Sequence, residues 1–248
     1  VLLNCHAGCG TEDVVSAMGL SMTDIMPPKN ELPTRPRPTL AAATPTRTTS
    51  QPITVEGLAR DKKLPEQFLR ELGLEDRPGG VVIPYLLTDG SLAPRQRLRT
   101  ALSAKNGSFW LGGKEPITAY GTDRLLDARE EGFLILTEGE SDCWTLWHHQ
   151  IPCLGIPGSG LTKVLQMEHL IGIPQLYYWR EPDKGGDTFA AGIVARLAEI
   201  GYVGEIREMK IEGVKDPSEL HQRDAQGFYK AFCEAMGEAI LLGAAPAP

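Results

Sequence analysis

The sequence has few cysteines, few aromatic residues and no hydrophobic run long enough to cross a membrane. Its 248 residues include five cysteines at uneven spacing, and this odd number favours a reducing compartment over a disulfide framework. No apolar stretch reaches the roughly 20 residues that a membrane-spanning helix needs, and no signal-peptide pattern is present at the start. We therefore expect a cytoplasmic protein with no membrane partner.

Positive charge is also scarce. Lysine and arginine total 25 against 32 acidic residues, giving a net charge of −7. This average disfavours a general nucleic-acid coat protein, but the charge is unevenly distributed. Residues 91–114 contain five lysines or arginines and no acid, whereas residues 127–142 contain six acids and one arginine. The sequence therefore pairs an acid-free basic segment with an acid-rich one.

Composition and pattern divide the chain into five parts. Residues 1–26 form a small unit, and residues 27–52, rich in proline, threonine and alanine, predict a disordered linker. Residues 53–130 mix helical and strand patterns and predict a small α+β subdomain. Strands and helices alternate through residues 131–242, which predicts an α/β domain with a mostly parallel sheet. Residues 243–248 form a tail.

The alternation in the α/β region is regular enough to predict its elements. We expect strands at residues 133–137, 152–156, 175–180 and 205–211, followed respectively by helices at residues 141–150, 161–172, 187–201 and 217–241. Right-handed crossovers place the loops after these strands at one edge of the sheet. In the preceding subdomain, an Asp-Gly turn between residues 81–87 and 92–98 predicts a hairpin.

Three loops at the predicted sheet edge are acidic. Glu138 follows the first strand. Glu181 and Asp183 follow the third strand, and Asp216 follows the fourth. Carboxylates gathered at one edge repel each other unless a cation neutralises them, and oxygen ligands without histidine or cysteine favour Mg²⁺ or Mn²⁺. Each acid alone is equally well explained as a helix cap, but the three loops together favour a metal site.

Groups that suit phosphate lie near these acids in the predicted fold. The loop after the second strand is glycine-rich and leads into a predicted helix, where backbone N–H groups suit a phosphate. We count as candidate nucleotide-binding or nucleic-acid-binding residues Gly158, Ser159, Gly160, Lys184 and Lys215.

A second phosphate-binding candidate is the basic strand before the α/β region. Arg95, Arg97 and Arg99 alternate, so a strand places them on one face, and Lys105 follows. Three guanidinium groups on one face suit a phosphate backbone or a nucleoside triphosphate. A solvated strand face is the alternative, but no acid lies nearby in the sequence to explain the charges.

The acidic loops resemble a known family. Residues 135–142 (ILTEGESD) and 181–183 (EPD) resemble the TOPRIM domain, a Rossmann-like domain shared by bacterial-type primases, topoisomerases and some nucleases. In that family one glutamate follows the first strand and an Asp-x-Asp pair follows the third. Glu138 matches the glutamate, which acts in acid/base or nucleotidyl chemistry. Glu181 and Asp183 match the Mg²⁺-binding pair, with glutamate replacing the first aspartate but keeping a carboxylate.

The flanking segments resemble primases of phage and plasmid type. Residues 215–217 (KDP) resemble a run near the end of primase TOPRIM domains, and residues 53–130 resemble their basal subdomain. Cys5 and Cys9 resemble the second half of the zinc ribbon that precedes such primases. Because a structural zinc site needs four ligands, Zn²⁺ is expected only if the missing half of the ribbon is present. A cysteine pair in a frayed end is the alternative.

These resemblances imply an enzyme of a phage, plasmid or other mobile element, a DNA primase-type nucleotidyltransferase. It would synthesise RNA primers on single-stranded DNA from nucleoside triphosphates, with Glu138, Glu181 and Asp183 as catalytic residues. The implied partner is a replicative helicase, fused or separate. The alternatives are a TOPRIM nuclease, which uses similar acids to cleave DNA, and a non-catalytic DNA-binding module of a primase-helicase.

Overall fold

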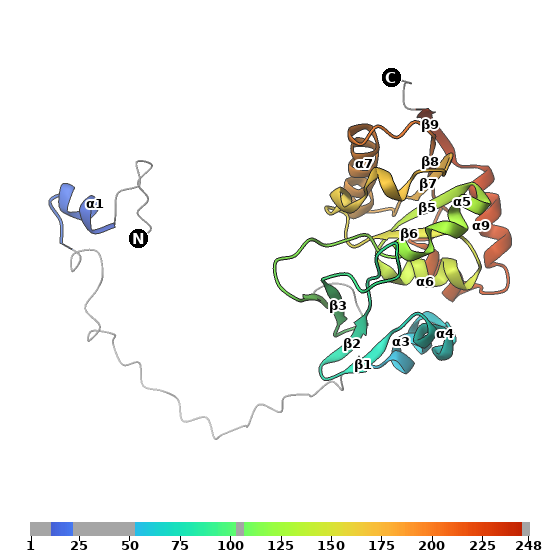
Figure 1. The fold of residues 1–248 in the computed structure, drawn as a ribbon, viewed down its shortest axis with the longest axis horizontal. Helices are drawn as coiled ribbons and strands as arrows, with labels where there is room; N and C mark the ends of the chain where they lie inside the picture. The colour runs from blue at the N-terminus through green and yellow to red at the C-terminus, as the bar shows by residue number, and fades with distance from the viewer. Residues whose placement is uncertain (1–10, 22–52, 103–106, 245–248) are drawn as a thin grey trace. The chain divides into compact units, whose positions relative to one another are not determined.

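The computed structural model describes residues 11–21, 53–102 and 107–244, in two compact units, Val1–Thr49 and Ser50–Pro248 (Figure 1). In the first unit it describes helix α1 (Thr11–Ala17), which ends before Gly19 at a φ of 73°. The predictions for Cys5, Cys9 and Lys105, and for the linker at residues 27–52, lie outside the described residues.

The second unit begins with two helices and a four-stranded antiparallel sheet paired in chain order. The elements are α3 (Val55–Lys62), α4 (Glu66–Glu71), β1 (Glu75–Arg77), β2 (Gly80–Ile83), β3 (Gln96–Arg99) and β4 (Ser108–Leu111). The predicted hairpin strands are shorter than expected. Pro84 follows β2 and has no N–H to continue the ladder, so only an isolated bridge joins Leu86 and Leu92.

A five-stranded sheet with the order β6-β5-β7-β8-β9 forms the centre of the α/β region (Figure 1). Its strands are β5 (Phe133–Glu138), β6 (Cys153–Ile156), β7 (Gln175–Trp179), β8 (Glu205–Met209) and β9 (Ile240–Ala244). Strands β5 to β8 are parallel, and β9 is antiparallel at one edge. The predicted α/β class with a mostly parallel sheet is therefore confirmed.

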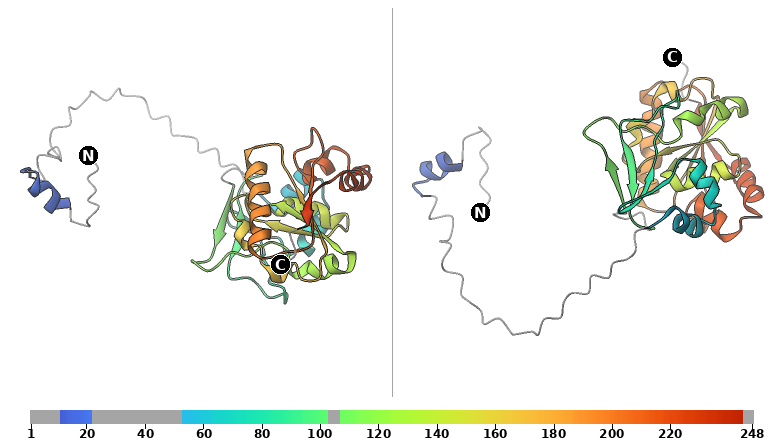
Figure 2. Two further views of the ribbon diagram at one scale, coloured as in Figure 1. Left: turned by 90° about the horizontal axis from the view of Figure 1, so that it is seen from above. Right: turned by 60° about the horizontal axis from the view of Figure 1, so that its bottom comes forward.

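Helices cover both faces of this sheet, and α7 and α9 lie on opposite sides (Figure 2). The helices are α5 (Leu125–Glu131), α6 (Glu140–His148), α7 (Lys184–Glu199), α8 (Pro217–Arg223) and α9 (Phe228–Gly237). Successive strand side chains point to opposite faces. Leu134 and Leu136 of β5 accordingly pack into the core beneath α5 and α7, and Ile135 packs into the core beneath α6 and α9.

The antiparallel sheet and the parallel sheet share one of these cores. Val55 and Tyr85 from the first part belong to the same buried cluster as Trp144 of α6 and Phe228 of α9. This shared core fixes the antiparallel part against the α6 and α8 side of the α/β region. Among the helices of the described residues, none is long and apolar enough to cross a membrane.

The predicted helix at residues 161–172 is wrong. The segment forms two short 3₁₀ turns, Thr162–Val164 and Met167–His169. The guanidinium of Arg196, from α7, donates to the carbonyl of Leu165 at 2.8 Å. That carbonyl would accept the N–H of His169 in an α-helix, so a contact from a distant element replaces the helical hydrogen bond.

The predicted long helix at residues 217–241 is also divided. It forms α8, α9 and the edge strand β9. The carboxylate of Asp224 accepts the N–H of Gly227 at 3.0 Å, which closes a turn between the two helices. The apolar residues of β9, which continue the helical pattern in the sequence, instead pair with β8.

Three histidines cluster where α3 meets α6 and α8. His149 Nε2 lies 2.9 Å from His221 Nδ1, and His221 Nε2 lies 3.0 Å from the carbonyl of Lys63. The His148 ring centre is 5.3 Å from that of His149. His148 and His149 are adjacent in the sequence, yet both rings lie near that of His221. Helix α6 ends at His148, so helical geometry does not hold the two rings apart.

Because of this histidine cluster, the free energy of unfolding of the protein should fall as the pH falls from 7.5 to 5. Burial, with His221 adding to it, lowers the pKa of His149 to about 4 and also lowers the pKa of His148. The unfolded chain binds these protons near pH 6.5 and the folded chain does not, so acid favours unfolding. Because both rings are partly exposed, we expect a loss of only about 1 kcal/mol.

Urea denaturation at several pH values checks this expectation, with His149→Gln as the comparison. The stability advantage of the wild type over this variant should shrink by about 1 kcal/mol between pH 7.5 and pH 5. A difference between the two proteins that does not change with pH would contradict it.

Candidate active site

The acidic loops meet at the carboxyl edge of the parallel sheet. A pocket of about 240 Å³ opens there, lined by Glu138, Ser141, Asp142, Glu181, Asp183, Gly185, Lys215 and Asp216. The four acids that the sequence predicts for the metal site are therefore brought together. The topology explains this, because parallel strands β5, β7 and β8 end at the same edge.

Local structure fixes three of these acids. Glu138 is the last residue of β5, and Gly139, at a φ of 98°, lets the chain turn into α6. Asp183 caps α7 by accepting the N–H of Gly186 at 2.9 Å. Asp216 caps α8 in the same way, accepting the N–H of Glu219 at 2.7 Å. The capping alternative is thus confirmed for Asp183 and Asp216, and each cap occupies only one of the two carboxylate oxygens.

Asp142 completes the acidic cluster, although it is not among the ligands that the sequence predicts. It lies in the first turn of α6, is only 4% exposed, and accepts the N–H of Ser218 at 3.1 Å. One carboxylate oxygen from each of Asp142, Glu181 and Asp216 lies within 4.8 Å of the others. The available signal was its place in the first turn of the helix that directly follows β5, because that turn lies at the same sheet edge as Glu138.

Lys215 supplies a positive charge to this cluster. Its Nζ lies 2.9 Å from a carboxylate oxygen of Glu181 and 3.2 Å from one of Asp216. Burial acts to lower the pKa of Lys215, but the two carboxylates outweigh burial and raise it. The sequence groups Lys215 with the phosphate-binding residues, whereas the structure places its ammonium among the carboxylates.

One ammonium group does not balance the buried carboxylates. Burial, with Asp216 and Glu181 adding to it, raises the pKa of Asp142 well above its usual range. Burial also raises the pKa of Glu181 to about 6 despite Lys215. The donor set consists of carboxylate oxygens alone, which fits a hard divalent cation such as Mg²⁺ or Mn²⁺.

Glu138 lies on the other side of the pocket, near Asp183. Burial raises its pKa, and the carboxylate of Asp183 raises it further, against hydrogen bonds from the N–H and hydroxyl of Ser159. The loop of Gly158, Ser159 and Gly160 therefore contacts the candidate catalytic residue Glu138 through hydrogen bonds from Ser159. The prediction that this loop opens an α-helix is wrong, because a 3₁₀ turn follows it.

The three predicted arginines have different surroundings. Arg99 is 5% exposed and donates to the carbonyls of Ala101 and Leu102 at 3.1 and 2.6 Å. These bonds to the loop after β3 use Nε and Nη2 of the guanidinium, and contact between Arg99 and phosphate stays a prediction. Arg95 and Arg97 lie against the ring of Trp110, with guanidinium carbons 5.5 and 4.8 Å from the ring centre.

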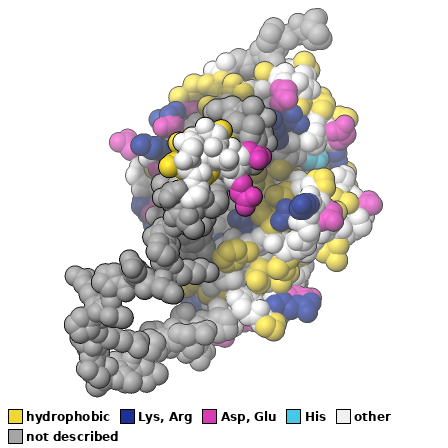
Figure 3. Space-filling view, turned by 90° about the vertical axis from the view of Figure 1, so that its left-hand side faces the viewer, with side chains coloured by type: hydrophobic (Ala, Val, Ile, Leu, Met, Phe, Trp, Pro, Cys, Tyr) yellow, Lys and Arg dark blue, Asp and Glu magenta, His cyan; other side chains and the backbone are white. Residues whose placement is uncertain are grey.

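The guanidinium groups of Arg95 and Arg97 are incompletely satisfied. The buried Nε of each has no hydrogen-bond partner within the described part of the chain. On the face drawn in Figure 3, lysine and arginine side chains lie among acidic and hydrophobic ones, without one continuous positive track over the described residues. Lys184, at the start of α7, is exposed.

No protein family and no curated protein matches the sequence. Solved structures of bacterial primases match its fold. A DnaG primase catalytic domain bound to single-stranded DNA has a TM-score of 0.57 and 16% identity, over 76% of this chain and 72% of that one. The RNA polymerase domain of Mycobacterium tuberculosis primase DnaG has a TM-score of 0.55 and 11% identity, over 74% and 75%.

The zinc-binding and RNA polymerase domains of Aquifex aeolicus primase match with a TM-score of 0.55 and 18% identity. That match covers 65% of this chain and 40% of the Aquifex chain, so this protein spans less than half of that neighbour. At these identities the likeness concerns the fold. The chain has the mixed α/β fold of DnaG-type primase catalytic cores.

Proposed function

We propose that this protein is a primase-like nucleotidyltransferase that joins ribonucleotides into primers on single-stranded DNA. The observation that carries the proposal is the buried cluster of Asp142, Glu181 and Asp216 with Glu138 beside it. These acids lie at the sheet edge of a fold that is similar to primase catalytic cores.

The acids divide into two groups with different tasks. Asp142, Glu181 and Asp216 would hold Mg²⁺ or Mn²⁺, which supplies charge neutralisation for a triphosphate under in-line attack. Glu138 would accept the proton of the attacking hydroxyl, because its raised pKa makes it a better base near neutral pH. Asp183 raises the pKa of Glu138 and anchors α7 at the same pocket.

Two arginines would bind the phosphates of the nucleotide or template. Arg95 and Arg97 hold their guanidinium groups against one aromatic ring, and the buried Nε of each has no hydrogen-bond partner within the described residues. Guanidinium groups suit phosphate oxygens because they offer several donors in a fixed plane. Lys184 is exposed, and its ammonium group would bind the same phosphates.

The sequence motifs narrow the proposal to a primase of a phage, plasmid or other mobile element. The run at residues 215–217 and the cysteine pair at positions 5 and 9 support this type. A helicase partner, and a zinc ribbon completed by further chain, belong to the same proposal. The acidic pocket itself needs neither of them.

Reaction products distinguish this function from its two alternatives. The protein is incubated with circular single-stranded DNA, labelled ribonucleoside triphosphates and Mg²⁺ or Mn²⁺. Labelled RNA oligomers are the expected result. Nicking of plasmid DNA without nucleotides would instead favour the nuclease. DNA binding with neither product would favour the non-catalytic module and overturn the proposal.

A further inference from the structure

Glu140, in the acidic loop after β5, points away from the acidic pocket. It is 6% exposed and does not line the pocket that Glu138 and Asp142 share. Its carboxylate instead accepts the hydroxyl of Tyr85 at 2.5 Å, across 55 positions of the sequence. A residue of the α/β region is thereby bonded to the antiparallel part of the protein.

The same carboxylate faces Arg97. Arg97 Nε lies 3.8 Å from Glu140 Oε1, too far for a hydrogen bond but close enough for an ion pair. The guanidinium also lies 4.8 Å from the centre of the Trp110 ring, and Nη1 lies 3.4 Å from the carbonyl of Pro157. Three groups therefore limit the directions that this guanidinium can take.

The chain places this guanidinium next to the active-site loops. Pro157 opens the loop whose Ser159 is hydrogen-bonded to Glu138. The Arg97 side chain is 19% exposed, so it remains open to a ligand. Arg95 lies on the same Trp110 ring, so two guanidinium groups lie close together, and of the two only Arg97 has an ion pair to a carboxylate within the described residues. The uncompensated positive charge suits an anion with several oxygens.

Tyr85 fixes the carboxylate that orients Arg97. Its ring is fully buried and packs edge-on against Trp110, with ring centres 5.0 Å apart. The hydroxyl donates to the same oxygen, Oε1, that faces Arg97. Loss of this hydroxyl would free the carboxylate to rotate without removing any charge.

We propose that Tyr85 and Glu140 are positioning residues that hold Arg97 in place to bind the triphosphate of the incoming nucleotide. The inference rests on the proposed function, which supplies the nucleotide as the ligand. The pair therefore determines affinity for the triphosphate and leaves the chemical step to the acidic pocket. A merely structural pair would instead change protein stability without changing nucleotide affinity.

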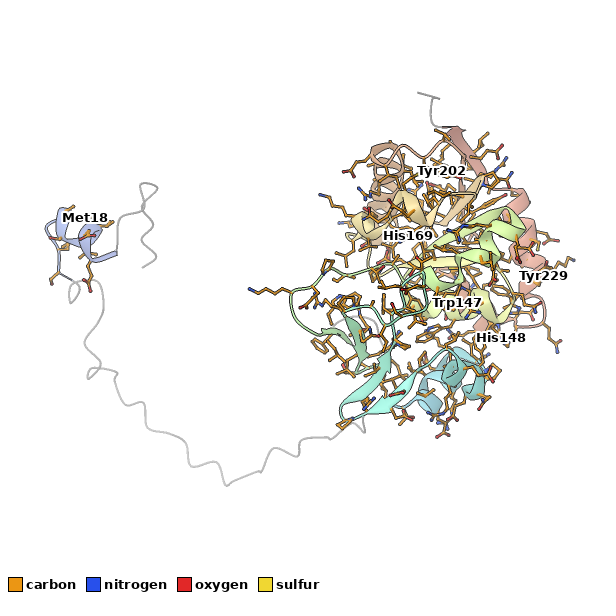
Figure 4. The ribbon with its side chains drawn as sticks, in the orientation of Figure 1. Met18, Trp147, His148, His169, Tyr202 and Tyr229 are labelled. Atoms are coloured by element: carbon orange, nitrogen blue, oxygen red, sulfur yellow. The ribbon has the colours of Figure 1, made fainter. Side chains whose placement is uncertain are left out.

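The test compares two tyrosine-to-phenylalanine variants. Tyr85→Phe removes the hydroxyl that Glu140 accepts. Tyr202→Phe, the matched control, removes a buried hydroxyl that donates to the carbonyl of Ile173 at 2.9 Å. Tyr202 precedes β8, so it lies at the amino ends of the parallel strands, whereas the acidic pocket lies at their carboxyl ends (Figure 4). Each loses one buried hydrogen bond, so general destabilisation affects both variants alike.

Affinity is measured with a non-hydrolysable nucleoside triphosphate analogue and Mn²⁺ by calorimetry, and KM and kcat are measured in primer synthesis. Tyr85→Phe should raise the Kd and KM about fivefold, the effect of one hydrogen bond, and leave kcat within about twofold. Glu140→Gln should act in the same direction. Tyr202→Phe should change none of these values.

A double-mutant cycle shows whether the effect passes through Arg97. In an Arg97→Ala background, Tyr85→Phe should have no further effect on the Kd. Equal effects in both backgrounds, or an unchanged Kd in folded Tyr85→Phe, would overturn the inference. A wild type that binds the analogue but makes no primers would overturn the proposed function and leave the binding comparison valid.

Discussion

Asp142→Asn should abolish tight divalent-metal binding and lower primer synthesis by about 100-fold or more. Asp142 is buried beside Glu181 and Asp216, and a neutral amide is a weaker ligand for a hard cation. Asparagine has nearly the same size and can still accept the N–H of Ser218. The fold should therefore survive, so lost activity would report on the metal site.

The same substitution should stabilise the metal-free protein. Burial raises the pKa of Asp142, so the folded state holds this carboxylate at an energetic cost near neutral pH. Removing the charge should therefore raise the free energy of unfolding in EDTA, by about 1 kcal/mol or more. Added Mn²⁺ should stabilise the wild type and leave the variant unchanged.

Thermal denaturation with and without Mn²⁺ measures both effects. Asp224→Asn is the matched control, because Asp224 also accepts a backbone N–H but lies outside the pocket. It should keep the full response to Mn²⁺. Destabilisation of Asp142→Asn in EDTA, or an Mn²⁺ response equal to that of the wild type, would show that the cluster is not a metal site.

Glu138→Gln should lower primer synthesis by about 100-fold while metal binding remains. Glu138 is in the pocket but outside the group of three acids whose oxygens lie together. Glutamine can still accept hydrogen bonds from Ser159, so the loop should keep its conformation. What is lost is the ability to accept a proton from the attacking hydroxyl.

Steady-state primer synthesis and Mn²⁺ calorimetry check this division of tasks. Glu199→Gln serves as the control, because Glu199 is an exposed glutamate at the end of α7. It should match the wild type in both measurements. If Glu138→Gln kept full activity, Glu138 would have no catalytic role. If it lost Mn²⁺ binding as fully as Asp142→Asn, Glu138 would belong among the ligands.

The sequence predicts the central sheet because its signals are local. Strands β5, β6 and β7 are short, mostly apolar runs, each followed by an acidic or glycine-rich loop, and this pattern can be recognised from the residues of the run itself. The elements that differ depend on distant partners. Arg196 captures the carbonyl of Leu165 and prevents an α-helix there. The residues of β9 continue a helical pattern in the sequence, but in the structure they form backbone hydrogen bonds with the distant strand β8.

The candidate site likewise contains residues that the local sequence predicts and residues whose positions depend on distant parts of the chain. Glu138, Glu181 and Asp183 could be predicted, because each follows a strand and strand ends meet at one edge. Asp142 follows the same strand end as Glu138, but its burial depends on α8, whose Ser218 donates its N–H to the carboxylate. The directions of Glu140 and Arg99 depend on Tyr85 and on the loop after β3, which spacing along the chain does not determine.

The most direct test of this account is labelled ribonucleotide incorporation on circular single-stranded DNA, compared among the wild type, Asp142→Asn and Tyr202→Phe. The account predicts RNA oligomers from the wild type and Tyr202→Phe that disappear in EDTA, and almost none from Asp142→Asn. Equal incorporation by the wild type and Asp142→Asn, or RNA synthesis that persists in EDTA, would contradict it.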